Sequence, residues 1–127
     1  MSTLLKTPWT GLKGRYYESL ALRYLKSQGL RLVQKNYRCT AGEIDLIMLD
    51  KHILIFIEVR FREDEDFGTA IETVDHRKQQ KVLRAAQHYL LLNKVYNCRQ
   101  CRFDVVGITR KNNAVELFWL PNAFDQT

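Results

Sequence analysis

Two carboxylates lie inside apolar runs of the sequence that are short enough to be strands. Asp45 belongs to the run GEIDLI at residues 42–47, and Glu58 belongs to the run FIEVR at residues 56–60. An ionised carboxylate is costly to bury in such surroundings unless a basic side chain or a metal ion pairs with it. A carboxylate on each of two successive strands, with the basic residue Arg60 two positions after the second, is the arrangement of a magnesium-dependent nuclease site.

The geometry of strands predicts that these groups can meet. Alternate side chains on a strand share a face, so Asp45 lies with Glu43, and Glu58 lies with Arg60. The polar connection DKH at residues 50–52 is short and favours an antiparallel hairpin. In such a hairpin Asp45 and Glu58 can lie on the same face, near the end away from the turn. The sequence leaves the register of the hairpin open.

Magnesium is the cation that suits these groups, with manganese as its substitute. It is usually held by one or two carboxylates together with water and substrate phosphate. Asp45 and Glu58 supply two ligands, and the backbone carbonyl of Val59 supplies a third. Arg60 can hold the scissile phosphate or stabilise developing negative charge, but an arginine does not act as a general base. A structural reading is open as well, in which Asp45 pairs with a buried Arg or Lys and Glu58 pairs with Arg60.

The periodicity of apolar residues predicts a single α/β domain over residues 1–127, with a central mixed sheet flanked by helices. The expected order is α-β-β-β-α-β-β. The expected elements are a loose lead-in (1–10), a helix (14–28) ending at Gly29, strands (31–38, 43–49 and 53–60), a loop or lid (61–72), a helix (75–93) capped by Thr73 or Asp75, and two further strands (102–108 and 114–120). The apolar stripes of the two helices are Tyr17, Leu20, Ala21, Tyr24 and Leu25 on the first and Val82, Ala85, Ala86, Tyr89 and Leu90 on the second.

Charge is distributed unevenly along the chain, which has a formal net charge of +6. Residues 1–38 contain eight basic residues and one acidic residue, and residues 76–127 contain nine basic and three acidic residues. The intervening residues 39–75 contain three basic and ten acidic residues. An acidic centre between two basic segments suits a protein that holds a cation and presents a phosphate-binding surface around it.

Several other classes of protein are disfavoured. No apolar run is long enough to cross a bilayer, the N-terminus lacks the pattern of a secretion signal, and three cysteines are few and odd in number, so a reduced cytoplasmic protein without membrane association is expected. There is no glycine-rich phosphate loop of the ATPase kind. The pair Cys98 and Cys101 is half of a zinc knuckle, but Cys39 and His88, which would complete it, lack the knuckle spacing.

These residues also carry a family resemblance that extends from about residue 14 to residue 120. The hairpin motifs resemble the PD-(D/E)XK nuclease superfamily, whose fold is restriction-endonuclease-like. Within that superfamily the chain is similar to the YraN-type bacterial family of uncharacterised, predicted endonucleases. Further matching pieces are GRYYE (14–18), Ala21, YL (24–25), FG (67–68), RK (77–78), AAQHYL (85–90) and FDVV (103–106).

The resemblance implies a restriction-endonuclease-like core and a metal-dependent endonuclease that cuts DNA, with branched or structured DNA as the preferred substrate. It implies that Asp45 and Glu58 are metal ligands, and that Glu18 approaches the site and can ligate through water. The order of elements also fits archaeal Holliday junction resolvases, and this analogy suggests a homodimer. The basic residues expected to contact nucleic acid are Lys13, Arg15, Arg60, Arg62, Arg77, Lys78 and Lys81.

Position 60 departs from the family pattern. The family usually carries its catalytic lysine there, whereas this chain has Arg60. Lys78 on the second helix is the best substitute for that lysine, because it lies four residues before Val82 on the inward stripe. The alternative is a nucleic-acid-binding module that keeps the nuclease fold without cutting, in which Arg60 marks the lost chemistry.

Overall fold

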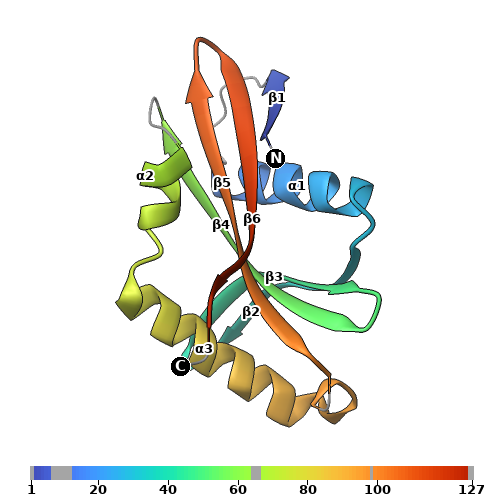
Figure 1. Cartoon of the computed structure of the whole chain (residues 1–127). Helices are drawn as coiled ribbons and strands as arrows, with labels where there is room; N and C mark the ends of the chain where they lie inside the picture. The colour runs from blue at the N-terminus through green and yellow to red at the C-terminus, as the bar shows by residue number, and fades with distance from the viewer. Residues whose placement is uncertain (1, 7–12, 64–66, 98, 126–127) are drawn as a thin grey trace.

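The computed structural model describes residues 2–6, 13–63, 67–97 and 99–125. Figure 1 shows an open, twisted sheet with helices packed against it. The elements are β1 (Ser2–Lys6), α1 (Lys13–Ser27), β2 (Arg31–Cys39), β3 (Gly42–Asp50), β4 (Ile53–Glu63), α2 (Phe67–Glu72), α3 (His76–Leu92), the 3₁₀ turn η1 (Lys94–Tyr96), β5 (Cys101–Lys111) and β6 (Ala114–Phe124).

The strands form one mixed sheet in the order β1-β6-β5-β4-β3-β2. Every neighbouring pair is antiparallel except β4 and β5, which are parallel. A parallel pair needs a crossover, because the chain must return to the starting edge before the second strand begins. Here α2 and α3 make that crossover. The mixed α/β class predicted from the sequence is therefore confirmed.

Apolar side chains pack on both faces of the sheet in two clusters. The stripe predicted for the first helix is buried against one face, and that predicted for the second helix packs against the other, so the two periodicities identified the inward faces correctly. The members from α1 are Tyr17, Leu20, Ala21, Tyr24 and Leu25, and those from α3 are Val82, Ala85, Ala86, Tyr89 and the partly buried Leu90.

The ends of the long helices are set by local chemistry. Gly29 follows α1 with a φ of 100°, a backbone conformation that costs glycine little, so the helix ends there as predicted. At the start of α3 the side chain of Asp75 accepts a hydrogen bond of 2.9 Å from the backbone N–H of Lys78. Asp75 is therefore the cap, one of the two candidates predicted.

Two segments differ from the prediction. Residues 2–6 were expected in a loose lead-in, but they form β1, which pairs with the outer edge of β6; residues 7–10 lie outside the described part of the chain. Residues 61–72 were expected to be a loop, but β4 continues to Glu63 because β5 pairs along its whole length. Residues 67–72 then form α2, and residues 64–66 lie outside the described part. Strand pairing and crossover packing are long-range effects that local periodicity does not report.

In the part of the chain that the structure describes, no helix combines the length and the apolar character that crossing a membrane requires.

Gly42 generates a prediction about stability. Its φ is 154°, and an added Cβ would lie 3.3 Å from the backbone carbonyl oxygen of Lys81 on α3. We expect Gly42→Ala to lower the free energy of unfolding by about 1–3 kcal/mol, since both the backbone conformation and the close approach oppose a side chain. Urea denaturation measures the change.

Gly14 is the matched control. It lies in α1 with nothing within 4 Å of an added Cβ. Gly14→Ala should leave the stability unchanged or raise it by up to about 1 kcal/mol. Equal losses in the two variants would refute the assigned role of the close contact between β3 and α3.

Candidate functional site

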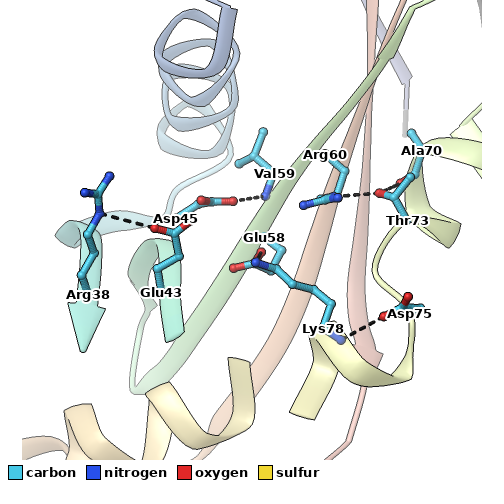
Figure 2. Close-up of polar contacts among 10 residues, drawn as sticks. All are labelled: Arg38, Glu43, Asp45, Glu58, Val59, Arg60, Ala70, Thr73, Asp75 and Lys78. Carbon is cyan, nitrogen blue, oxygen red and sulfur yellow. Dashed lines mark hydrogen bonds and ion pairs between the residues drawn. The ribbon is translucent and has the colours of Figure 1, made fainter. Parts of the chain in front are cut away.

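The candidate site begins where β3 and β4 stop pairing. Their ladder ends at the pair of Leu46 with Ile57, and Asp45 and Glu58 are the next residues on each strand. Asp45 crosses the gap with its side chain, because its Oδ2 accepts a hydrogen bond of 2.8 Å from the backbone N–H of Val59. Figure 2 shows Asp45 directed toward Val59, with Glu58 beside it on β4. The sequence thus placed them correctly at the end of the hairpin away from the turn.

Glu58 is a buried carboxylate that the described residues satisfy only in part. Its side chain is 1% exposed, and Oε2 lies 3.5 Å from Nζ of Lys78 on α3. The other oxygen, Oε1, is buried and has no hydrogen-bond partner. A buried carboxylate oxygen without a donor is strongly unfavourable. Oε1 of Glu58 therefore lacks a hydrogen-bond donor or a cation to compensate its burial.

The pKa values of Asp45 and Glu58 also indicate that the pair lacks a compensating positive charge. Burial, followed by the negative charge of Asp45, raises the pKa of Glu58 from 4.5 to about 8, although Lys78 opposes the shift. Burial also raises the pKa of Asp45, against the hydrogen bond from Val59 and the charge of Lys78. A buried carboxylate beside a second negative charge favours its protonated form unless a cation compensates the charge.

Arg60 is held away from Glu58, so the ion pair considered from the sequence is replaced by the pair of Glu58 with Lys78. The Nε of Arg60 donates a hydrogen bond of 2.7 Å to Oγ1 of Thr73. That hydroxyl in turn donates a hydrogen bond of 2.6 Å to the carbonyl oxygen of Ala70 in α2. Figure 2 shows this chain of contacts beside the carboxylates. Thr73 was considered from the sequence only as a helix cap, and its contact with Arg60 depends on a crossover that the sequence does not reveal.

Glu18 approaches the site from α1, as the resemblance implied. Burial raises the pKa of Glu18, and the negative charges of Asp45 and then Glu43 raise it further. Glu18 therefore lies close enough to Asp45 and Glu43 to interact with them electrostatically. Glu18 also lines a hollow of about 280 Å³ together with Arg60 and Tyr17. The helix and the sheet therefore bring a third carboxylate to the edge of the pair.

The expected basic residues are spread over three elements. Arg15 on α1, Arg62 on β4, and Arg77 and Lys81 on α3 are exposed, while the side chain of Lys13 lies outside the described part of the structure. A second hollow of about 320 Å³ is lined by Arg15 and Glu18 together with Ser19, Lys35 and Asn36. Lys35 and Asn36 on β2 were missed because an exposed lysine or asparagine on a strand carries no distinctive signal.

The donor set fits a hard cation with open coordination positions. Among the described residues, no three His, Cys, Asp or Glu side chains form a group that could hold a metal by themselves. Two carboxylates and a backbone carbonyl match magnesium, which keeps water and substrate oxygens as its other ligands. Cys98, one member of the zinc half-site considered from the sequence, lies outside the described residues. The other member, Cys101, is partly buried, and this burial raises the pKa of its thiol.

The raised pKa of Glu58 predicts how stability depends on pH without metal. Between pH 4.5 and about 8 the folded protein holds a proton on Glu58 that the unfolded chain has lost. The free energy of unfolding should therefore fall as the pH rises through this window, and Glu58→Gln should flatten the fall and be more stable than the wild type at pH 8. Urea denaturation in a chelator across this range measures both curves.

Glu72→Gln removes an exposed carboxylate and serves as the control. Its stability curve should parallel that of the wild type. Parallel curves for Glu58→Gln and the wild type would show that Glu58 is ionised in the folded protein at the same pH as in the unfolded chain.

Comparison with known proteins identifies the family. The model of the uncharacterised protein family UPF0102 matches residues 17–108. A UPF0102 protein of Nitrosococcus oceani is 50% identical over 112 residues, covering 88% of this chain and 90% of the relative. A UPF0102 protein of Stutzerimonas stutzeri is 47% identical over 112 residues, covering 88% and 93%. One from Legionella pneumophila strain Corby is 45% identical over 113 residues, covering 89% and 94%. The chain belongs to the UPF0102 family, which is the YraN-type family that its motifs resemble.

Proposed function

We propose that this protein is a metal-dependent endonuclease that hydrolyses phosphodiester bonds in DNA. The observation that carries the proposal is the carboxylate pair just beyond the end of the β3–β4 ladder, in which Oε1 of Glu58 is buried without a hydrogen-bond partner. A buried carboxylate beside a second, partly buried one is a costly arrangement. A bound divalent cation would remove that cost, and the two carboxylates would then serve as its ligands.

The cation would be held by the carboxylates of Asp45 and Glu58 and by the backbone carbonyl of Val59, with Glu18 reaching it through water. When bound, magnesium or manganese supplies Lewis acidity, which stabilises charge on a phosphate and favours deprotonation of water. Lys78 now lies 3.5 Å from Glu58 and supplies the positive charge that a bound ion would share.

The remaining groups have separate roles toward the phosphate. Arg60 supplies a guanidinium that stabilises negative charge as it develops on the scissile phosphate. The hydrogen bond to Thr73 fixes the position of the Arg60 guanidinium. Because the guanidinium is anchored through Nε, its terminal nitrogens are left for the substrate. An arginine does not act as a general base, so Lys78 is the candidate for the role of the lysine that position 60 lacks.

Charge and fold support a nucleic acid as the substrate. The net charge of +6 comes from basic segments on either side of the acidic centre, and exposed basic residues lie on α1, β4 and α3, the elements that also carry Glu18, Glu58 and Lys78. The observed order contains the expected α-β-β-β-α-β-β, with β1 added before it and α2 inserted after β4, and this supports a restriction-endonuclease-like core as part of the proposal. DNA is the phosphodiester polymer that we infer, and branched or structured DNA is the form to test first.

The direct test is cleavage of labelled single-stranded, duplex and four-way-junction DNA with magnesium or manganese. Asp45→Asn and Glu58→Gln keep the size of each side chain and remove a ligand charge, so each should lower the cleavage rate at least about a hundredfold. Asp50→Asn, on the same strand as Asp45, is the matched control and should cut at the wild-type rate.

Metal-dependent cutting lost in both site variants supports the nuclease. Cutting by Asp45→Asn at the wild-type rate would contradict it. DNA binding without cutting under any of these conditions would favour the alternative of a binding module.

The contact between Arg60 and Thr73 gives a second prediction. Thr73→Val removes the acceptor of the Arg60 hydrogen bond while keeping the shape of the side chain, so kcat should fall about ten- to a hundredfold as the guanidinium is misplaced. Thr73→Ser keeps the hydroxyl and should retain most of the activity. Steady-state kinetics with KM and kcat measured separately are the readout. Equal losses in Thr73→Ser and Thr73→Val would assign Thr73 to packing instead.

A further inference from the structure

A hollow of about 320 Å³ lies between α1 and β2, and we call it the α1–β2 hollow. Glu18 lines this hollow and also lines the hollow of about 280 Å³ that contains Arg60, so the two hollows meet at one side chain. The other residues that line the α1–β2 hollow are Arg15, Ser19, Lys35 and Asn36. The hollow is therefore next to the candidate site, but only Glu18 among its residues has a part in the proposed hydrolysis.

The pairing of β2 with β3 places the hollow beside Asp45. Lys35 pairs with Leu46 in this ladder, so the next residues along the two strands, Asn36 and Asp45, face each other. Residues that face each other in an antiparallel pair have Cα atoms about 5 Å apart. The side chain of Asn36 also forms a hydrogen bond with Glu18. Asn36 thus links the hollow to both carboxylates.

The backbone of Asn36 accounts for two successive residues of β2 lining one hollow. Successive side chains of a regular strand point to opposite faces of the sheet. Asn36 has a φ of 51°, in the left-handed region that asparagine tolerates better than most residues. This conformation breaks the alternation, so Lys35 and Asn36 both reach the α1–β2 hollow.

Two basic residues of the hollow have charges that the described chain leaves unpaired. Arg15 on α1 and Lys35 on β2 are both exposed. Neither side chain forms an ion pair with another described residue. Glu18 is the one acidic residue among the described residues that line the hollow, so two positive charges and one negative charge leave a net charge of +1 there. A single phosphodiester group carries the opposite charge.

The surface around the hollow is basic as well. Residues 13–38 contain seven basic residues and one acidic residue, which is Glu18. Arg38 is paired at 3.4 Å with Glu43, whereas the other basic residues whose side chains are described here form no ion pair within the described chain. A surface of this kind attracts a polymer that carries a negative charge at every unit. The exposed basic residues of this segment are Arg15, Arg23, Lys26, Arg31, Lys35 and Arg38.

We propose that the α1–β2 hollow binds the phosphate of the substrate strand that neighbours the scissile phosphate. This inference rests on the proposed function, because the hollow adjoins the site of hydrolysis at Glu18. Arginine, lysine, serine and asparagine commonly contact phosphate oxygens, and four of the five residues that line the hollow are of these types. Arg15 and Lys35 hold the phosphate by charge, and the hydroxyl of Ser19 donates a hydrogen bond to it.

The two hollows together define a path for the strand. A strand held by Arg60 in one hollow and by Arg15 and Lys35 in the other passes over Glu18, which places the bond to be cut beside the carboxylate pair. A carboxylate of a partner protein could pair with Arg15, but a single carboxylate leaves the basic residues along α1 and β2 without partners. A nucleic-acid strand supplies a charge for each of them.

The salt dependence of DNA binding tests the inference without any cutting. The affinity of the wild type for single-stranded and duplex oligonucleotides is measured by fluorescence anisotropy in a chelator, at several salt concentrations. Each phosphate contact contributes about 0.7 for a single strand, or about 0.9 for a duplex, to the slope of log affinity against log salt. Arg15→Gln and Lys35→Gln should each reduce the slope by that amount. Lys94→Gln removes the same charge at an exposed position beyond the end of α3 and should keep the wild-type slope.

Neutral methylphosphonate linkages test the position of the bound phosphate. One such linkage next to the cleaved bond should slow cutting by the wild type about tenfold, because it removes a charged hydrogen-bond acceptor. The same linkage should slow Lys35→Gln clearly less, since the variant has already lost part of that contact. Arg15 and Lys35 are exposed, so their variants should unfold at the wild-type temperature in a thermal scan.

The outcomes separate this inference from the proposed function. Slopes of Arg15→Gln and Lys35→Gln equal to that of the wild type would overturn the inference, even if the wild type cuts DNA. A methylphosphonate penalty that is the same in Lys35→Gln and the wild type at every linkage would overturn it as well. Reduced slopes in both variants, with no cutting by the wild type, would support the phosphate site and contradict the proposed hydrolysis.

Discussion

This site depends on the electrostatic cost of placing two carboxylates next to each other, with Glu58 buried and Asp45 partly buried. Asp45 and Glu58 lie just beyond the last residue pair of the β3–β4 ladder, so the pairing of the two strands places them near each other. Burial raises the pKa of both groups, the negative charge of Asp45 raises that of Glu58 further, and the negative charge of Glu43 adds to the shift of Asp45. An apolar residue at either position would relieve this cost. That the chain carries acids at both positions is the physical reason to infer a bound cation.

The surrounding elements supply what the pair lacks. On one side α3 contributes Lys78, whose ammonium neutralises part of the charge on Glu58. On the other side α1 contributes Glu18, and the crossover contributes Thr73, which orients Arg60. A parallel β4–β5 pair requires that crossover, so the sheet topology and the position of the arginine are linked. Sheet, helices and connection thus act together at one end of the hairpin.

Local patterns in the sequence were enough to predict the hairpin, its two carboxylates and the inward stripes of α1 and α3, because alternation and helical periodicity encode which face is buried. They were also enough to select Lys78 as the basic residue beside the pair. The edge strand β1, helix α2 and the contact from Arg60 to Thr73 were not predictable, since each depends on a partner far away in the sequence. The pair of Lys78 with Glu58, in place of Arg60 with Glu58, has the same origin.

Direct binding of manganese to the metal-free protein tests the central claim most closely. Titration followed by electron paramagnetic resonance should find a bound ion that magnesium displaces, with binding lost in Asp45→Asn and in Glu58→Gln. The account predicts this whether or not any DNA is cut. Wild-type protein that binds no manganese at pH 8, where about half of the Glu58 side chains are ionised, would show that Lys78 alone satisfies the carboxylates and would contradict the account.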